Sequence, residues 1–429
     1  MDKSKFLDIL AAELVVALGC TEPIAVAYAA ALARRQLAGH EISAVKVYVS
    51  GNVVKNAMAV TIPGTNTCGV DMAAALGVVA GDADKHLEVL AALTAKDVDQ
   101  AERMIKEGIV TVDVADSDRK LYIEVNVHSP SSHAKVVVEN EHTNIVLVEV
   151  DGKIVSKCDC EAAQASDADV TRSFLSIDSI WDFVHVVAIR DLGIVVESIE
   201  LNTLIATEGL ANRYGLQVGK TIKNYVGKGI LGDDLATHAM ALAAAGSDAR
   251  MAGSSLPVMS NSGSGNQGIS ATMPVVAAGE RLAATRDEII RAVTLSHLIT
   301  IYIKSKFGRL SAICGAIVSG TGASCGITYL LGGGIEATKF AIQNMLGNVT
   351  GMLCDGAKPG CAMKIATCTN AAVQSALLAI EGLGITETEG IIERIPRHSI
   401  ENLCRIGNEG TAEADRIILD IMLNKQSKD

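Results

Sequence analysis

Aromatic residues are scarce in this chain. Only 3% of its 429 residues are Phe, Tyr or Trp, although 49% are hydrophobic. The core must therefore be built mainly from Ala, Val, Ile, Leu and Gly, whose small or compact side chains permit close helix packing. The length allows a large core and favours an organisation in two or three domains.

Basic charge is also in deficit, with 37 Lys and Arg against 49 Asp and Glu and a formal net charge of −12. Such a chain would repel nucleic acid. Apolar runs are interrupted well before the roughly 20 residues needed to span a bilayer, and the first residues show no export signal. We therefore expect a cytoplasmic protein without nucleic-acid or membrane partners; a homo-oligomer is left open.

The hydrophobic pattern divides the chain into three parts. Residues 1–40 contain two helices, over 4–18 and from about 23 to 37, which are expected to pack on the catalytic domain. Residues 41–195 combine period-two strands with helices and predict an α+β sheet domain. Residues 196–429 are Ala/Ile/Leu-rich and predict an all-helical catalytic domain. The predicted fold is α+β, with a smaller α/β sheet domain inserted near the N-terminus of a large helical protein.

Glycine- and serine-rich stretches at 260–268, 319–326, 332–334 and 355–360 are predicted to be joints between helices. The first contains a GxGxxG pattern, but no βαβ alternation surrounds it, so a dinucleotide site is disfavoured. A nest that binds a small carboxylate is the favoured interpretation, and a purely structural turn is the alternative. Its candidate contact residues are Ser262, Ser264, Asn266 and Gln267.

Three cysteines, Cys314, Cys354 and Cys361, carry the strongest chemical signal. The last two frame the glycine-rich segment Cys-Asp-Gly-Ala-Lys-Pro-Gly-Cys. Three thiolates can hold an iron–sulfur cluster and leave one iron open for Lewis-acid chemistry, whereas electron-transfer clusters usually have four. The alternative is that the cysteines of this part of the chain act as small buried hydrophobes, an interpretation that fits the neighbouring Cys325 well.

Two further residues are candidates beside this cysteine set. Cys20 precedes the Thr21-Glu22-Pro23 start of a predicted helix, where the helix dipole would lower its pKa and favour a reactive thiolate. A core cysteine between two helices is the alternative. Lys358 lies in the cysteine-framed segment and is a candidate for binding a substrate carboxylate, although a solvated lysine is the more common outcome.

Taken together, four motifs resemble the L-cysteine desulfidase family, which is related to the α-chain of iron–sulfur L-serine dehydratases: Gly19-Cys20-Thr21-Glu22-Pro23, Ser260–Gly268, Ser319–Gly326 and Cys354–Cys361. The resemblance covers essentially the whole chain. It implies a [4Fe–4S] cluster on Cys314, Cys354 and Cys361, with Cys325 as an alternative to Cys314, and Cys20 as proton acceptor. The short cysteine-framed loop favours the desulfidase branch over the dehydratase branch.

The reaction that this resemblance implies is α,β-elimination of L-cysteine to pyruvate, ammonia and hydrogen sulfide. A base must meet the Cα proton while the leaving sulfur is stabilised. The alternatives are deamination of L-serine and a non-catalytic protein in which the cluster senses cysteine or redox state. A pyridoxal-phosphate enzyme could perform the same reaction, but the helical, cysteine-framed C-terminal part argues against it.

Overall fold

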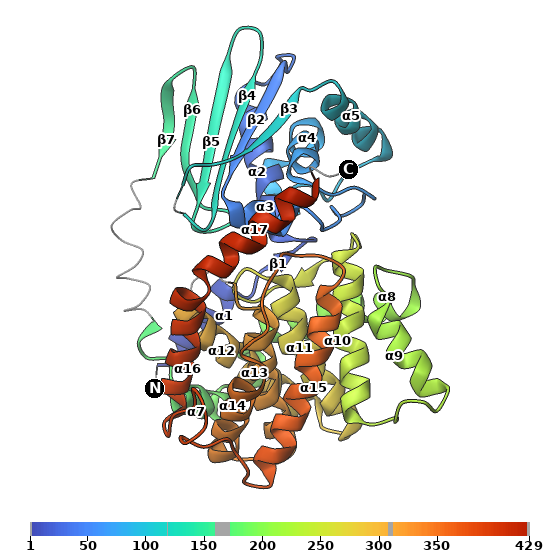
Figure 1. Ribbon diagram of the computed structural model, residues 1–429, viewed down its shortest axis with the longest axis vertical. Helices are drawn as coiled ribbons and strands as arrows, with labels where there is room; N and C mark the ends of the chain where they lie inside the picture. Colours follow the sequence, from blue (N-terminus) through green and yellow to red (C-terminus); the bar gives the residue numbers. More distant parts are fainter. Residues whose placement is uncertain (1, 118, 159–171, 308–311, 427–429) are drawn as a thin grey trace.

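The computed structural model describes residues 2–117, 119–158, 172–307 and 312–426. Figure 1 shows a domain that contains a β-sheet above a larger domain of packed helices. Each domain has its own hydrophobic core. The predicted α+β class, with a helical C-terminal part and a smaller sheet domain near the N-terminus, is confirmed.

The smaller domain holds a six-stranded sheet in the order β3-β2-β4-β5-β6-β7. Strands β2 and β3 run parallel, and the other neighbouring pairs are antiparallel. Val45, Val47 and Val49 of β2 are buried because alternate side chains of a strand share one face. The bounds are β2 Ala44–Val49, β3 Val110–Val114, β4 Tyr122–His128, β5 His133–Glu139, β6 Ile145–Val150 and β7 Lys153–Lys157.

Helix α2 (Thr21–Gln36) packs on strands β4 and β5, and α4 (Val70–Ala80) packs on α2. Every residue from Thr21 to Ala33 is buried. The small residues permit this close layering: a side chain on Gly77 of α4 would overlap the backbone of Ala27. The other helices of this domain are α3 Gly51–Ala57, the 3₁₀ helix η1 Ala83–Glu88 and α5 Ala95–Lys106.

The larger domain surrounds helix α13, which contacts α11, α12, α14 and α15. A short pairing of β1 with β8 joins its N-terminal segment to the segment before α11. No helix in the described ranges is both long and apolar enough to cross a membrane. The bounds are α1 Lys3–Glu13, β1 Val16–Ala17, α7 Ile177–Val186, η2 Ile189–Asp191, α8 Gly193–Ala211, α9 Val218–Gly227, α10 Leu235–Met251, β8 Val258–Met259, α11 Gly265–Arg281, α12 Arg286–Phe307, α13 Gly315–Leu330, α14 Ile335–Val349, α15 Cys361–Ile380, α16 Pro396–Arg405, η3 Ile406–Gly410 and α17 Ala412–Gln426.

The packing places two segments differently from the predicted division into 1–40, 41–195 and 196–429. Of the two N-terminal helices, only α1 packs with the helical domain, while α2 belongs to the core of the sheet domain. The buried apolar residues between Leu175 and Val195 belong to the helical core rather than to the sheet domain. Helix α2 is apolar on all sides, so its sequence does not indicate which domain it contacts.

The segment 319–326, predicted to be a joint, lies inside helix α13 and is fully buried. Its glycines create room for neighbouring helices instead of bending the chain. A side chain on Gly322 would overlap the Ser296 carbonyl of α12, and one on Gly326 would lie 2.7 Å from the Ala292 carbonyl. Burial at close contact offsets the low helix propensity of these residues.

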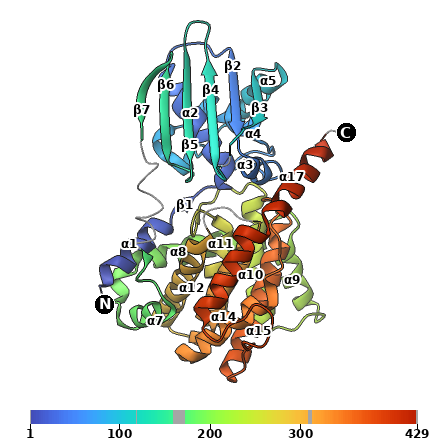
Figure 2. The ribbon, with the colours of Figure 1, turned by 60° about the vertical axis from the view of Figure 1, so that its left-hand side comes forward.

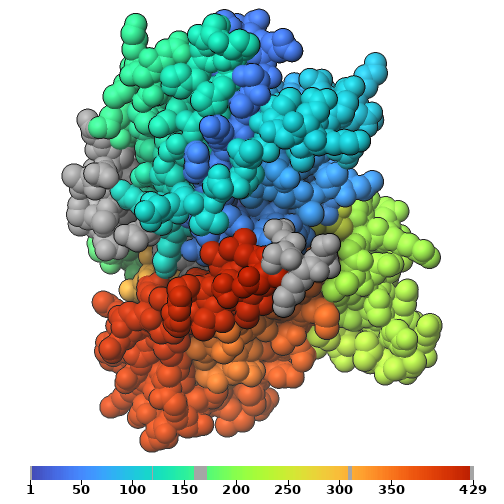
Figure 3. Space-filling view, turned by 45° about the horizontal axis from the view of Figure 1, so that its top comes forward, coloured from blue at the N-terminus to red at the C-terminus, as the bar shows by residue number. Residues whose placement is uncertain are grey.

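The C-terminal helix α17 returns from the helical domain to the sheet domain, where it lies near α3 (Figure 2). Leu419 packs against Gly51, and Asp415 forms an ion pair with Lys55 of α3. In the space-filling view, this red segment lies along the boundary between the two domains (Figure 3). The two domains are therefore connected both by the N-terminal part of the chain and by its last helix.

Candidate active site

The three predicted cysteines meet where two chain segments pair. Cys314 is the N-cap residue of α13, Cys361 begins α15, and Cys354 lies in the loop before α15. The backbone N–H of Cys354 donates to the Ala312 carbonyl at 2.6 Å, and that of Cys314 donates to the Met352 carbonyl at 3.0 Å. All three cysteines line one cavity, whose empty volume with its open mouth is about 890 Å³.

The three cysteines surround a cavity, which is the arrangement that a [4Fe–4S] cluster requires. Among the described residues, no group of three His, Cys, Asp or Glu side chains is placed to hold a single metal ion. A [4Fe–4S] cluster takes its thiolates on different irons, so its cysteines surround a space. Burial and the neighbouring Cys354 raise the pKa of Cys314 to about 12, and burial raises the pKa of Cys361. Binding to a metal is what turns such thiols into thiolates.

Cys325, the alternative to Cys314, lies elsewhere. It is on α13, eleven residues beyond Cys314, which corresponds to about 16 Å along a helix axis. It is buried in the helical core and, within the described residues, does not line the cavity. Burial raises the pKa of Cys325 to about 12. Its surroundings are those of a core cysteine.

Cys20 lines the same cavity, but its surroundings differ from those expected for a reactive thiolate. It is the N-cap residue of α2 and packs in a small cluster that includes Met251 and Cys361. Burial, and then the neighbouring Glu22 carboxylate, raise the pKa of Cys20 well above its usual value. The prediction of a lowered pKa is therefore wrong for this structure, because desolvation and a nearby negative charge outweigh the helix dipole.

In the sequence, Glu22 looks only like part of a helix start. In the structure, it is the central buried carboxylate of the site. Its Oε2 accepts from the Cys20 thiol and the Thr21 hydroxyl, both at 3.1 Å, and its Oε1 accepts from Asn56 Nδ2 at 3.0 Å. His142 Nε2 lies 3.9 Å from Oε1. Burial opposes ionisation, but His142 and the Cys20 thiol outweigh it and lower the pKa of Glu22 to about 2.

The predicted loop residues Ser262, Ser264, Asn266 and Gln267 all line the cavity. Several of their groups are already used within the loop: Ser262 Oγ donates to Asn261 Oδ1 at 2.8 Å, and Ser264 Oγ caps α11 by accepting from the Gln267 N–H. Gln267 Nε2 donates to the Asn261 carbonyl at 3.0 Å. The buried Asn266 Oδ1 and Gln267 Oε1 have no hydrogen-bond partner in the part of the chain that the structure describes.

A buried histidine on helix α12 contacts this loop through Asn261. His297 of α12 lies with Nδ1 3.0 Å from Asn261 Nδ2 and with Nε2 2.8 Å from Ser198 Oγ. Burial lowers the pKa of His297 to about 3, so it is neutral near pH 7. Sequence patterns assign no role to His297, because an isolated histidine on an apolar helix has no distinguishing pattern.

Lys358 is the one predicted contact residue that is not part of the cavity lining among the described residues. Its ammonium pairs with the Asp355 carboxylate and also donates to the Asp355 carbonyl at 3.1 Å. Lys364 pairs with the same carboxylate and donates to the Leu353 carbonyl at 2.7 Å. Both lysines thus hold the cysteine-framed loop.

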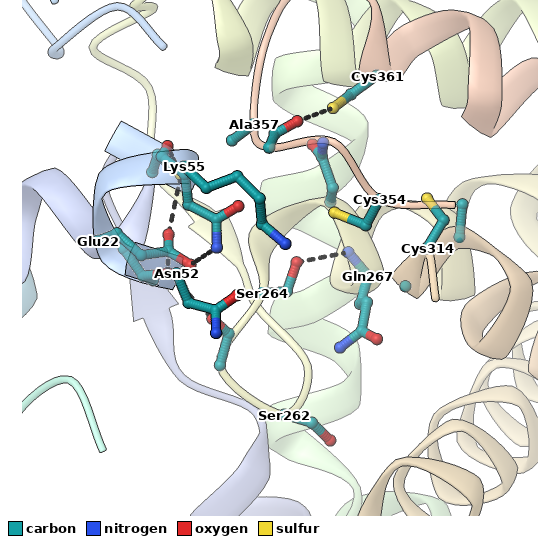
Figure 4. A pocket seen from close by; sticks show the side chains of 18 of the residues that line it. Glu22, Asn52, Lys55, Ser262, Ser264, Gln267, Cys314, Cys354, Ala357 and Cys361 are labelled. Carbon is teal, nitrogen blue, oxygen red and sulfur yellow. Dashed lines mark hydrogen bonds between the residues drawn. The ribbon is translucent and has the colours of Figure 1, made fainter. Parts of the chain in front are cut away.

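The sheet domain supplies residues that sequence reasoning missed: Asn52, Lys55, Asn56 and His142 line the cavity together with Glu22. Figure 4 shows Glu22, Asn52 and Lys55 across the cavity from Cys314 and Cys354. Lys55 is almost fully buried and pairs with Asp415. Since these residues come from separate elements, no motif links them to the cysteines. The cavity is enclosed by both domains.

Comparison with known proteins identifies the relatives of this chain. Residues 84–420 match the family described as serine dehydratase alpha chain. A "UPF0597 protein" of Oleidesulfovibrio alaskensis is 48% identical over 99% of this chain and 98% of the relative. Proteins of the same name from Shewanella pealeana and Parabacteroides distasonis are 44% and 42% identical, with at least 98% of each chain covered. The chain therefore belongs to the serine dehydratase alpha-chain family, and its activity is of a dehydratase-related, lyase type.

Proposed function

We propose that this protein is an iron–sulfur-dependent lyase that eliminates hydrogen sulfide from L-cysteine, leaving an enamine that hydrolyses to pyruvate and ammonia. The observation that carries the proposal is that Cys314, Cys354 and Cys361 line one cavity together with Cys20. The family is generally associated with iron–sulfur clusters, which agrees with this donor set.

The three cysteines would hold a [4Fe–4S] cluster through their Sγ atoms. When bound, such a cluster supplies a Lewis-acidic iron with an open position, which suits a soft leaving atom such as sulfur. The pairing of the Ala312 and Met352 segments positions Cys314 and Cys354 through backbone hydrogen bonds. Lys358 and Lys364 then keep the intervening loop in place through Asp355.

Cys20 would accept the Cα proton, but it must first lose its own. Its thiol is protonated in this environment and donates to Glu22 Oε2 at 3.1 Å. Glu22 Oε2 is the adjacent acceptor for this proton. Because the pKa of Glu22 lies far below that of Cys20 in this structure, proton transfer from Cys20 Sγ to Glu22 Oε2 requires substrate binding to lower the pKa of Cys20 relative to that of Glu22; the resulting thiolate can then take the Cα proton. Sulfide leaves with the electron pair of the C–S bond, and Glu22 can return its proton to it.

Elimination of water from L-serine is the second candidate, because the matching family is described as serine dehydratase alpha chain. The same base and the same cavity would serve both substrates. They differ in the leaving atom, which is a soft sulfur in L-cysteine and a hard oxygen in L-serine.

The test is anaerobic reconstitution with iron and sulfide, followed by assay of pyruvate and sulfide from L-cysteine and of pyruvate from L-serine. We expect turnover of L-cysteine that is lost on exposure to air. Pyruvate from L-serine alone would favour the second candidate, and no product from either would reject the proposed lyase activity.

Two matched pairs of variants assign the cysteines. Cys361→Ala should lose the brown absorbance and the bound iron, whereas Cys325→Ala, in the helical core, should keep both. Cys20→Ser should keep the iron and lose turnover, whereas the exposed Cys68→Ser should keep both. An intact cluster in Cys361→Ala would remove that residue from the ligand set, and full turnover in Cys20→Ser would remove Cys20 from proton transfer.

A further inference from the structure

Arg250 is a buried cation in the wall of the cavity. Arg250 lies near the end of α10, is only 3% exposed and lines the cavity. Among the residues that the structure describes, its Nε has no hydrogen-bond partner and no carboxylate forms an ion pair with it. A buried charge without a partner is unfavourable, so this guanidinium requires an anion that the described residues do not supply.

Nearby acidic residues are directed elsewhere. Asp248 lies two residues before Arg250 on the same helix, and residues with this spacing do not face each other. Its carboxylate accepts from the Gly219 N–H at 3.0 Å, towards α9. Glu22 also lines the cavity, but its oxygens accept from Cys20, Thr21 and Asn56. Asp248 Oδ1 has no hydrogen-bond partner among the described residues, but neither carboxylate forms an ion pair with Arg250 there.

The surroundings of Arg250 are shaped to hold a guanidinium. A Cβ on Gly265 would lie 2.7 Å from Arg250 Cζ, so only glycine leaves room for the guanidinium there. Gly265 is also the first residue of α11, a helix of 17 residues whose N-terminus favours negative charge. The arginine and the start of the helix therefore favour an anion at the same place.

Complementary acceptors lie beside this anion site. Asn266 Oδ1 and Gln267 Oε1 are buried without donors and line the same cavity. The amide of Gln267 is oriented by the hydrogen bond from Nε2 to the Asn261 carbonyl. A Cβ on Gly315 would lie 2.8 Å from Gln267 Oε1, which places this oxygen next to Cys314. Free donors and free acceptors in one cavity match a zwitterion.

We propose that Arg250 binds the α-carboxylate of an amino-acid substrate and that Asn266 Oδ1 and Gln267 Oε1 accept hydrogen bonds from its ammonium group. This deepens the proposed function, on which it rests for the choice of substrate class. It replaces Lys358 and the serine hydroxyls as the carboxylate contact. Cys20 packs against Met251, the residue after Arg250, so a carboxylate on Arg250 holds Cα on the side of Cys20.

The test uses L-alanine, which has the α-carboxylate and the ammonium group but no leaving group, and ethylamine, which lacks the carboxylate. Isothermal titration of the full-length, reconstituted protein should detect L-alanine and not ethylamine. Arg250→Gln should weaken L-alanine binding by at least tenfold, because a charge-assisted hydrogen bond is worth roughly 1.5–3 kcal/mol. The control Arg281→Gln, which removes an arginine paired with Asp233 outside the cavity, should bind normally.

Stability provides a second readout. Arg250→Gln removes an unpaired buried charge, so its Tm without ligand should equal or exceed that of the wild type. A lower Tm would mean that the guanidinium is structural and would overturn the proposal, as would unchanged L-alanine binding or none in the wild type. Arg250→Lys keeps the charge without the fork, and its affinity should be intermediate. L-alanine cannot undergo elimination, so its binding tests this site separately from turnover. Arg250-dependent binding of L-alanine by a protein that releases no product from L-cysteine or L-serine would reject the proposed lyase and retain this site.

Discussion

Replacing Asp415 by Asn should loosen the attachment of helix α17 to the sheet domain. The side chain of Lys55 is 2% exposed and that of Asp415 is 20% exposed, so the variant would leave a buried ammonium without its carboxylate. Removing one partner of a buried pair costs roughly 3–5 kcal/mol, and the partial exposure of Asp415 favours the lower end, about 3 kcal/mol. From Ala412 to Lys425, no residue of α17 is buried, so this cost should appear first as local opening.

Hydrogen exchange measured by mass spectrometry is the appropriate assay. A loss of about 3 kcal/mol corresponds to roughly a hundredfold faster exchange in peptides from α17 and α3. The control is Glu413→Gln, which removes the partner of Arg416 on the same helix, where both side chains are largely exposed. Surface pairs of this kind contribute little, so exchange should not change measurably.

A double variant separates the two causes of the effect. Lys55→Met combined with Asp415→Leu removes both charges, and it should recover most of the stability lost in Asp415→Asn. Wild-type exchange in Asp415→Asn would refute the reasoning, because it would mean that Lys55 needs no counter-charge. Equal loss in the double variant would assign the effect to packing.

Three other variants test the packing and the electrostatics. Gly322→Ala should destabilise the protein by roughly 1–3 kcal/mol in urea unfolding, whereas Gly227→Ala in α9, where an added Cβ meets nothing, should not; equal effects would contradict the packing argument. The pKa of His297 is about 3 in the fold and about 6.5 when unfolded, so stability should fall by up to about 1.4 kcal/mol per pH unit below pH 6.5, and His297→Gln should flatten this slope. Glu22, with a pKa lowered from 4.5 to about 2, contributes about 3 kcal/mol above pH 4.5 that is lost as the pH falls towards 2; the stability difference between the wild type and Glu22→Gln should shrink in that range.

The fold class, and the candidacy of Cys354 and Cys361, could be predicted from the sequence because both depend on local patterns. Period-two alternation indicates strands, and Cys354 and Cys361 stand out from core cysteines by the polar, glycine-rich segment between them. The buried segment 319–326 could not be distinguished from a joint, because glycine and serine serve both turns and close helix contacts. The pKa of Cys20 was misjudged because the dipole of a following helix is visible in a sequence, whereas desolvation is not.

The burial and pairing of the charged residues in the cavity result from contacts between segments that are far apart in the sequence, so local patterns do not reveal them. Arg250 ends an Ala-rich helix, where an arginine ordinarily complements the helix dipole, and only its lack of a partner sets it apart. Lys55 looks like a solvated lysine until α17 brings Asp415 to it. Glu22 resembles any acidic residue in a first helical turn, and only the packing of α2 reveals its burial.

The order in which the chain is synthesised also determines when Lys55 can pair with Asp415. These residues are 360 positions apart, so the counter-charge of Lys55 is synthesised long after the lysine itself. While the chain is still growing, the ammonium at the wall of the cavity has no carboxylate, and the sheet domain has not been joined by α17. The pair therefore forms only after α17 has been synthesised, long after the cavity-lining residues of α2 and α3.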